Sequence, residues 1–261
     1  MRPELRALVT NDDGVDSPGL AVLARAAAEV GFDVVVAAPD RQYSGSAASL
    51  TAVQTHGRTV TEERPPCGGA PTYAVRAAPA HIVVAALSGW FDPPPDLVLS
   101  GVNRGSNVGR AILHSGTVGA ALTAALHDRR GLAVSLDVAL GSTRDEHWEA
   151  VHEHLLPVLG LVEQAEVGTV LSLNVPDLPA DRHRELRSAS LDPRGSVQTL
   201  VEESGVDGMV VREVEVAGPP EPGSDRALLA DGHPTLTALH GVGEAAERID
   251  LPDSPDRAGR P

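Results

Sequence analysis

Short apolar runs alternate with amphipathic stretches over the first two thirds of the chain. Residues 6–10 form one apolar run, and residues 33–38 form a second, β-branched one. Between them, apolar residues recur at helical spacing from Pro18, with Ser17 in position to cap the helix and Gly31 to end it. The first forty residues therefore predict a βαβ unit.

The same alternation continues as far as residue 176. It predicts an extended segment over 73–77, strands over 97–100, 132–136 and 169–173, and helices over 79–87, 117–127 and from Ser142 or Thr143 to about 163. Strands that alternate with helices are typical of an α/β fold with a doubly wound, mostly parallel, Rossmann-like sheet. In such a sheet, ligands bind beyond the carboxyl ends of the strands.

The C-terminal part of the chain has a different pattern, with short β-like segments separated by turns rich in Gly and Pro. We expect an α/β catalytic domain over residues 1–180 and a small β-rich appendage over 181–240 that completes the same domain. Residues 241–261 have few apolar anchors, and we expect them to be disordered. Exposed β segments in the appendage could exchange strands between subunits as an oligomerisation arm, so we expect a homodimer or homotetramer.

Composition narrows the classes of function. The 261 residues carry a formal net charge of −15, which would repel a nucleic-acid polymer over most of the surface. No apolar run approaches the length of a membrane span and no signal-peptide pattern precedes the first strand, so we expect no membrane association. The single cysteine, Cys67, forms no disulfide framework and fits a reducing, cytoplasmic location.

Adjacent carboxylates follow the first predicted strand. Asp12 and Asp13 lie in the polar turn 11–14, where both side chains can point toward one hard cation. Asn, Asp and Gly are also common in turns for conformational reasons, and this segment alone gives a turn and a site equal weight. Three more polar loops, over residues 40–46, 100–109 and 114–117, accompany other predicted strand ends. Because such loops converge at one edge of the sheet, we favour a site.

Two of these loops carry groups suited to a metal ion or a phosphate. Amide side chains in residues 100–109 can ligate a cation or bond a phosphate, although a long surface loop has the same composition. Ser115, Gly116 and Thr117 open a predicted helix, where free amides and the helix dipole favour an anion. An ordinary helix cap is the more frequent interpretation of that segment taken alone.

Four motifs, in their order and spacing, resemble the SurE nucleotidases. They are residues 10–14 with Ser17-Pro18-Gly19, residues 38–41 with Ser44-Gly45 and Ser49-Leu50-Thr51, Ser100-Gly101-Val102-Asn103, and Ser115-Gly116-Thr117-Val118. The resemblance implies a divalent metal ion held by Asp12, Asp13, Ser44 and Asn103. Oxygen ligands of these kinds suit Mg²⁺, Mn²⁺ and Ca²⁺ alike, so the identity of the metal stays open.

The same resemblance implies a metal-dependent phosphomonoesterase that hydrolyses nucleoside 5′- and 3′-monophosphates to nucleoside and phosphate. We expect Asp12 and Asp13 to fix the metal ion and one of them to orient the attacking water. The residues that we expect to bind substrate are Asn11, Gly45, Asn107, His114, Ser115, Gly116 and Thr117. Direct attack by water and passage through a phospho-aspartate both stay open.

The chain departs from the usual family pattern around the expected pocket. His114 stands where relatives commonly have an aromatic residue, and Thr123-Ala124 stand where they have Glu-Gly. His114 could act as a general acid toward the leaving group, but packing is the more frequent role of such a histidine. These departures keep open a catalytically silent relative that binds nucleotide or metal, whereas the presence of all four expected ligands favours an enzyme.

Overall fold

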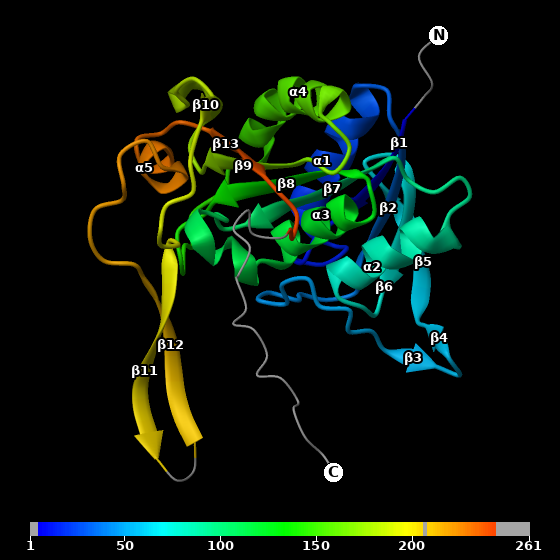
Figure 1. The fold of residues 1–261 in the computed structure, drawn as a ribbon, viewed down its shortest axis with the longest axis horizontal. Coiled ribbons are helices and arrows are strands. Elements are labelled where there is room, and N and C mark those ends of the chain that lie inside the picture. The colour runs from blue at the N-terminus through cyan, green and yellow to red at the C-terminus, as the bar shows by residue number, and fades with distance from the viewer. Residues whose placement is uncertain (1–4, 206–207, 244–261) are drawn as a thin grey trace, which may run out of the picture.

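The computed structural model describes residues 5–205 and 208–243, and its centre is a mostly parallel β-sheet (Figure 1). The strands of this sheet are β1 (Arg6–Thr10), β2 (Asp33–Pro39), β5 (Thr61–Cys67), β6 (Ala70–Val75), β7 (Leu97–Arg104), β8 (Arg130–Asp137), β9 (Val170–Pro176), β10 (Arg187–Ser188) and β13 (Thr235–Leu239). Their order across the sheet is β10-β13-β9-β8-β7-β1-β2-β6-β5. The predicted α/β, mostly parallel fold is confirmed.

The chain changes direction across the sheet next to β1. From β1 it runs outward through β2 to β6, and it then returns to the other side of β1 to form β7, β8 and β9, all parallel to their neighbours. Only the margins are antiparallel, where β5 pairs with β6 and β13 pairs with β9. The reversal between β1 and β7 opens a crevice at the carboxyl ends of these two strands, which is the usual ligand position in this topology.

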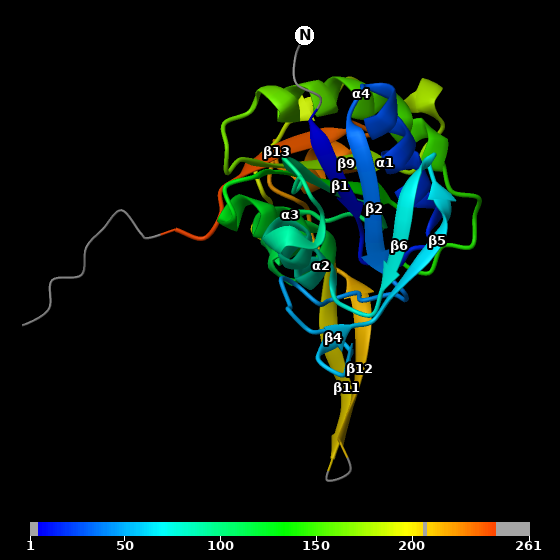
Figure 2. The ribbon, with the colours of Figure 1, turned by 90° about the vertical axis from the view of Figure 1, so that its right-hand side faces the viewer.

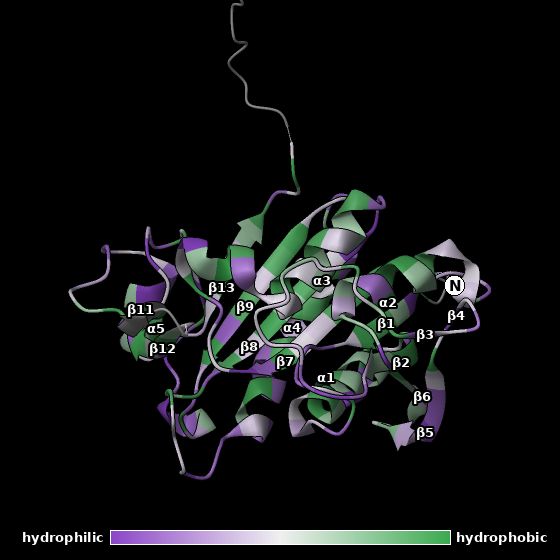
Figure 3. Ribbon diagram, turned by 90° about the horizontal axis from the view of Figure 1, so that it is seen from below, coloured by the Kyte–Doolittle hydropathy of each residue, from purple (hydrophilic) through white to green (hydrophobic). Residues whose placement is uncertain are grey.

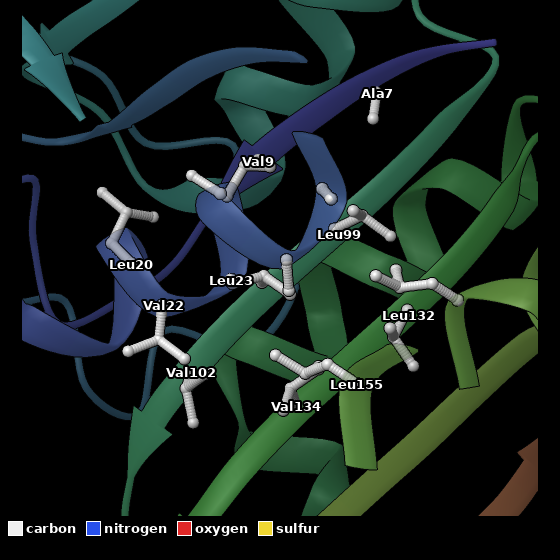
Figure 4. Close-up of a cluster of buried hydrophobic side chains, with 14 of the residues drawn as sticks. Ala7, Val9, Leu20, Val22, Leu23, Leu99, Val102, Leu132, Val134 and Leu155 are labelled. Atoms are coloured by element: carbon white, nitrogen blue, oxygen red, sulfur yellow. The ribbon is translucent and has the colours of Figure 1, made fainter. Parts of the chain in front are cut away.

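Helices cover both faces of the sheet. The helices are α1 (Pro18–Glu29) and α4 (Trp148–Gln164) on one face, and α2 (Pro79–Ala85) and α3 (Gly116–Leu126) on the other (Figure 2). Figure 4 shows the first layer, where Leu23 of α1, Leu155 of α4 and Leu99 of β7 belong to one cluster of buried side chains. On the opposite face, Leu8 of β1 packs with Ile82 of α2. Because strands are buried on both faces, they read as continuous apolar runs in the sequence.

The predicted strand over 97–100 is too short, because β7 continues to Arg104. After an irregularity in the pairing, Asn103 and Arg104 lie opposite Ser135 and Leu136 of β8, and the side chain of Val102 is fully buried. The Gly-rich composition of residues 100–104 had favoured a loop, whereas pairing with the neighbouring strand outweighs that local preference. Asn103 is therefore placed by the sheet rather than by a free loop.

The predicted start of the long helix at Ser142 or Thr143 is also wrong. Helix α4 begins at Trp148, and residues 138–147 form a loop. The loop is held away from the helical path because the Arg104 guanidinium donates to the Ser142 carbonyl and the His147 backbone N–H donates to Asp177. Tertiary hydrogen bonds thus replace the predicted cap.

The segment after β9 adds strands to the sheet and also forms a separate hairpin. Strands β11 (Val197–Gly205) and β12 (Gly208–Glu215) form an antiparallel hairpin that projects from the body (Figures 1 and 2). Helix α5 (Asp225–Ala230) was not predicted, and β13 then returns to pair with β9. The division at residue 180 stays a prediction. Most of the expected disordered tail, residues 244–261, lies outside the described residues.

The remaining elements are short. They are the two-residue strands β3 (Gln54–Thr55) and β4 (Arg58–Thr59), the π-turn η1 (Ala86–Trp90), and the 3₁₀ turns η2 (Gly109–His114) and η3 (Ala180–Arg182). In Figure 3, the strands at the centre of the sheet are largely hydrophobic and the connecting loops largely hydrophilic. Over residues 5–205 and 208–243, no helix has both the length and the apolar character needed to cross a membrane.

Candidate active site

The turn after β1 is closed by the side chain of Asn11. Its Nδ2 donates to the Gly14 carbonyl (3.0 Å), and its Oδ1 accepts from the Gly14 backbone N–H (3.1 Å). Gly14 has φ +105°, a left-handed conformation that glycine adopts without strain. Asn11 is fully buried and does not line the cleft described below. In this geometry Asn11 shapes the turn that presents Asp12 and Asp13.

The Asp12 carboxylate is buried at the start of α3. Only 4% of the residue is exposed, and the hydroxyl of Thr117 donates to its Oδ1. Burial raises the pKa of Asp12 to about 6; the Thr117 hydroxyl opposes this shift, and the neighbouring Asp13 adds to it. Asp12 therefore has a stronger tendency to hold a proton, or to accept a cation, than an ordinary aspartate.

Gly116 allows the first turn of α3 to approach Asp12 closely. A Cβ atom at Gly116 would lie 2.7 Å from Asp12 Oδ2 and 2.7 Å from Ser46 Oγ. The hydroxyl of Ser46 is buried there and has no hydrogen-bond partner among the residues that the structure describes. Ser115 caps the helix by accepting from the Val118 backbone N–H (3.0 Å). The positive end of the helix dipole is thus directed at the carboxylate.

Asp13 faces the end of β7. Its Oδ2 accepts from the Arg104 backbone N–H (2.8 Å). Burial raises the pKa of Asp13; the Arg104 backbone and guanidinium counteract the shift, and the nearby Glu146 reinforces it. Glu146 is itself paired with Arg104 Nε at 2.5 Å. Asp12 and Asp13 are therefore adjacent carboxylates, and burial disfavours the charged form of each.

Asn103 and Ser44 reach the same place from two other elements. Asn103 Nδ2 donates to the Gly105 carbonyl (2.7 Å), which leaves its Oδ1 on the side of Thr117 Oγ1, 3.3 Å away. Ser44 is exposed and accepts from Gln42 Nε2. The loop that carries Ser44 is tied to the first turn by the Tyr43 backbone N–H, which donates to the Asp12 carbonyl (2.7 Å). The structure therefore brings these loops together beside Asp12.

A cleft of about 1100 Å³ runs across this edge of the sheet. Seven of the predicted residues line it: Asp12, Ser44, Gly45, Asn103, Asn107, His114 and Ser115. Gly116 and Thr117 are buried behind Asp12, and Asp13 is partly buried beside it. Asn107 donates to Ser135 Oγ (2.8 Å) through its side chain, whereas His114 is exposed.

The cleft also contains residues that sequence reasoning missed. They include Arg104, Ser106, Arg110, Asp137 and Arg226, which come from β7, η2 and its preceding loop, β8 and α5. No local motif marks Arg226, because its place depends on how the C-terminal segment folds back. Asp137 ends β8, so the rule that ligands gather at strand ends could have found it.

A family model described as Survival protein SurE matches residues 7–196. The chain belongs to the SurE family. It is 34% identical to the 5′-nucleotidase SurE of Dehalococcoides mccartyi, with 90% of this chain and 89% of the relative covered. It is 35% identical to the 5′/3′-nucleotidase SurE of Escherichia coli O127:H6, with 90% of each chain covered.

A solved structure shares this SurE fold. The crystal structure of SurE protein from Aquifex aeolicus matches with a TM-score of 0.72 and 26% identity, over 90% of this chain and 93% of that one. The four motifs and the three-dimensional arrangement therefore lead to the same family.

SurE nucleotidases are in general metal-dependent, and the donor groups here fit a hard cation. Among the described residues there is no group of three or more His, Cys, Asp or Glu side chains that could hold a metal ion. A cation would instead take the Asp12 and Asp13 carboxylates with the Asn103 amide oxygen and the Ser44 hydroxyl, all oxygen donors. The raised pKa values of both aspartates fit this interpretation, because a cation would offset the cost of their burial.

Proposed function

We propose that this chain hydrolyses nucleoside 5′- and 3′-monophosphates to a nucleoside and inorganic phosphate. The observation that carries the proposal is Asp12, which lines an open cleft beneath the N-terminus of α3, with Asp13 partly buried next to it. Carboxylates can hold a cation and helix-terminal amides can bind an anion, and both functions assist phosphoryl transfer. Two relatives at 34% and 35% identity are named as nucleotidases.

The phosphate would bind between the metal ligands and the first turn of α3. Ser115 lines the cleft, and the backbone N–H groups at the start of this helix precede its first internal hydrogen bonds. Gly45 and Asn107 line the adjoining walls. These groups would hold the phosphoryl oxygens in place while the bond to the nucleoside oxygen breaks.

In the reaction, water oxygen forms a bond to phosphorus, the ester P–O bond breaks, and a proton passes to the nucleoside oxygen. A bound divalent cation would supply Lewis-acid polarisation and make the attacking water more acidic. Asp12, Asp13, Asn103 and Ser44 would hold that cation, and one of the aspartates would orient the water. A phospho-aspartate route uses the same residues.

His114 is the candidate for donating the proton to the leaving group. It is exposed on the wall of the cleft at the end of η2, so its ring can reach a bound ester. Its backbone carbonyl also accepts from the Ala47 backbone N–H (3.2 Å), which joins the two loops beside the cleft. A glutamine at this position that leaves the pH–rate profile unchanged would exclude the proton-transfer role.

The finer properties follow from the same groups. We infer Mg²⁺ or Mn²⁺ as the metal, with Ca²⁺ able to occupy the site, because the donors are oxygens. The exposed apolar hairpin supports a homodimer or homotetramer. The single, free Cys67 supports a cytoplasmic location.

The test is phosphate release from a panel of nucleoside 5′- and 3′-monophosphates with Mg²⁺ or Mn²⁺, with EDTA, and with Asp13→Asn. We expect metal-dependent release that falls by at least about a hundredfold in Asp13→Asn, because the variant loses one of two anionic ligands. Asp16→Asn is the matched control, since Asp16 is an exposed carboxylate in the same turn. Its activity should equal that of the wild type.

Two outcomes would count against the proposal. Near-normal turnover by a folded Asp13→Asn protein would remove the assigned role of this residue. Binding of metal without release of phosphate from any ester would favour a catalytically silent relative instead.

A further inference from the structure

Asp137 occupies a defined position on the wall of the cleft. It is the last residue of β8, two positions beyond Ser135, and side chains two apart on a strand point to the same face. The Ser135 hydroxyl accepts from Asn107 Nδ2 (2.8 Å), and Asn107 lines the cleft. Asp137 therefore lies on the cleft side of the sheet, and it lines the same cavity as Asp12.

The carboxylate of Asp137 has no basic partner among the described residues. The Ser106 hydroxyl favours its charged form, whereas the charged groups that act on it, Asp177 and Glu215, are acidic. Burial raises its pKa, and these two carboxylates reinforce the shift. A partly buried carboxylate without a cation carries an energetic cost, which hydrogen-bond donors from a ligand would reduce.

The distance from Asp137 to the phosphate position suits the rest of a mononucleotide. In the sheet, β8 is separated from β1 by β7 alone. At roughly 4.8 Å per strand, β8 lies about 10 Å from β1. A phosphate bound at Asp12 would extend its ribose and base along the cleft toward β8.

Resting on the proposed function, we propose that Asp137 is a specificity residue that accepts hydrogen bonds from the nucleoside part of the substrate. An acidic side chain recognises groups that donate hydrogen bonds and repels groups that only accept. Adenosine offers two such sources, the ribose hydroxyls and the exocyclic amino group of the base. The Asp137 carboxylate could accept hydrogen bonds from either source.

The test compares catalytic efficiency, kcat/KM, for matched esters in the wild type and in Asp137→Asn. Adenosine 5′-monophosphate is compared with its 2′-deoxy form for the ribose, and with inosine 5′-monophosphate for the amino group. Phenyl phosphate, which has neither group, reports on the phosphate site alone. Asp181→Asn is the matched control, because Asp181 is an exposed carboxylate that does not line the cleft.

We expect Asp137→Asn to lower kcat/KM for adenosine 5′-monophosphate about tenfold to a hundredfold, mainly through KM, and to leave phenyl phosphate unchanged. Loss of the preference for the ribonucleotide would identify the hydroxyls as the source, and loss of the preference over inosine monophosphate would identify the amino group. Asp181→Asn should keep both preferences.

Three results would overturn the inference. Unchanged kinetics in Asp137→Asn would exclude contact with the nucleoside, and an equal fall for phenyl phosphate would show that the residue serves the phosphate site or the fold. An equal loss of preference in Asp181→Asn would show a general effect of charge. If the wild type hydrolyses no ester at all, the proposed function itself fails and this inference fails with it.

Discussion

Asp12 is buried where its negative charge lowers the stability of the folded protein, and the same position suits it to bind a cation. Its pKa rises from 3.8 to about 6, and 4% of the residue is exposed. A carboxylate with a raised pKa in the folded state destabilises that state at pH values above the raised pKa, and the penalty disappears below 3.8. A shift of this size corresponds to about 3 kcal/mol. The folded protein therefore keeps a destabilising negative charge at a position where a bound cation would offset its cost.

Asp12→Asn should therefore stabilise the metal-free protein. At pH 8 in EDTA we expect a gain of about 1–3 kcal/mol in the free energy of unfolding, falling to nothing near pH 4, because the amide removes the buried charge. With excess Mn²⁺ the order should reverse, since the wild type gains stability from bound metal and the variant loses a ligand.

Urea unfolding at the two pH values, with and without metal, measures this effect. Asp16→Asn, which alters an exposed carboxylate in the same turn, should show neither effect. A metal-free Asp12→Asn protein that is less stable than the wild type would show that Asp12 serves the fold.

The residues of the site were predictable to different degrees. Asp12, Asp13 and Asn103 follow or end strands that the apolar runs reveal, so the strand-end rule brings them together. The sequence allowed a turn at residues 11–14, but it did not show that Asn11 closes this turn with two hydrogen bonds to Gly14. Ser46 carries no motif, and only the packing of α3 places it beside Asp12.

At the level of elements, two buried aspartates join the C-terminal segment to the cleft. Asp225 begins α5 and accepts from the Gly109 backbone N–H (2.7 Å) and from the Asp192 backbone N–H (2.9 Å). Asp192 in turn accepts from the backbone N–H groups of Arg194 and Glu221. Burial tends to raise the pKa of Asp192, but these donors and the Ser224 hydroxyl together lower it. Gly109 starts η2, so this pair fixes the turn that carries His114.

Asp225→Asn should loosen that turn. Both carboxylate oxygens of Asp225 accept from N–H groups, and an amide would direct its own N–H₂ at one of these donors. We expect a loss of about 2–3 kcal/mol in stability and a fall in kcat/KM of about tenfold, because η2 lines the cleft. Thermal unfolding and nucleotidase assays measure the two effects. An unchanged kcat/KM in a destabilised but folded variant would separate η2 from catalysis.

The exposed carboxylate of Asp181 supplies the control for this prediction. It lies in η3, also in the C-terminal part of the chain, and Asp181→Asn removes the same charge without a buried acceptor. Both stability and activity should stay at wild-type values.

The elements show why sequence patterns succeed for the sheet centre and fail at its edges. The runs for β1 and β2 are apolar because both faces of these strands are buried, and the pattern alone marks their bounds. The end of β7 and the start of α4 are set by contacts between distant segments, such as Arg104 with Ser142. The local propensity of the sequence does not reveal those long-range contacts.

At the scale of the whole molecule, the fold of one chain does not account for the projecting β11–β12 hairpin and its exposed apolar side chains. It projects from the body in Figures 1 and 2, and Met209 is 69% exposed and Val211 is 53% exposed. An isolated two-stranded hairpin is only marginally stable in water. Apolar side chains on such a hairpin are typical of a surface that a second chain covers. The base of the hairpin also lines the cleft through Val197 and Glu215, so assembly and the substrate site are neighbours.

The double variant Met209→Glu and Val211→Glu should therefore disrupt assembly. Residues two apart on a strand share a face, so the two charges would lie together on one side of β12. We expect the wild type to have the mass of a dimer or tetramer at micromolar concentration and the variant that of a monomer, by light scattering. Arg212→Gln is the control, because Arg212 lies on the opposite face of β12 and is paired with Glu202 at 2.6 Å. A monomeric wild type would contradict the prediction, whereas a monomeric variant with reduced kcat/KM would show that assembly also supports the cleft.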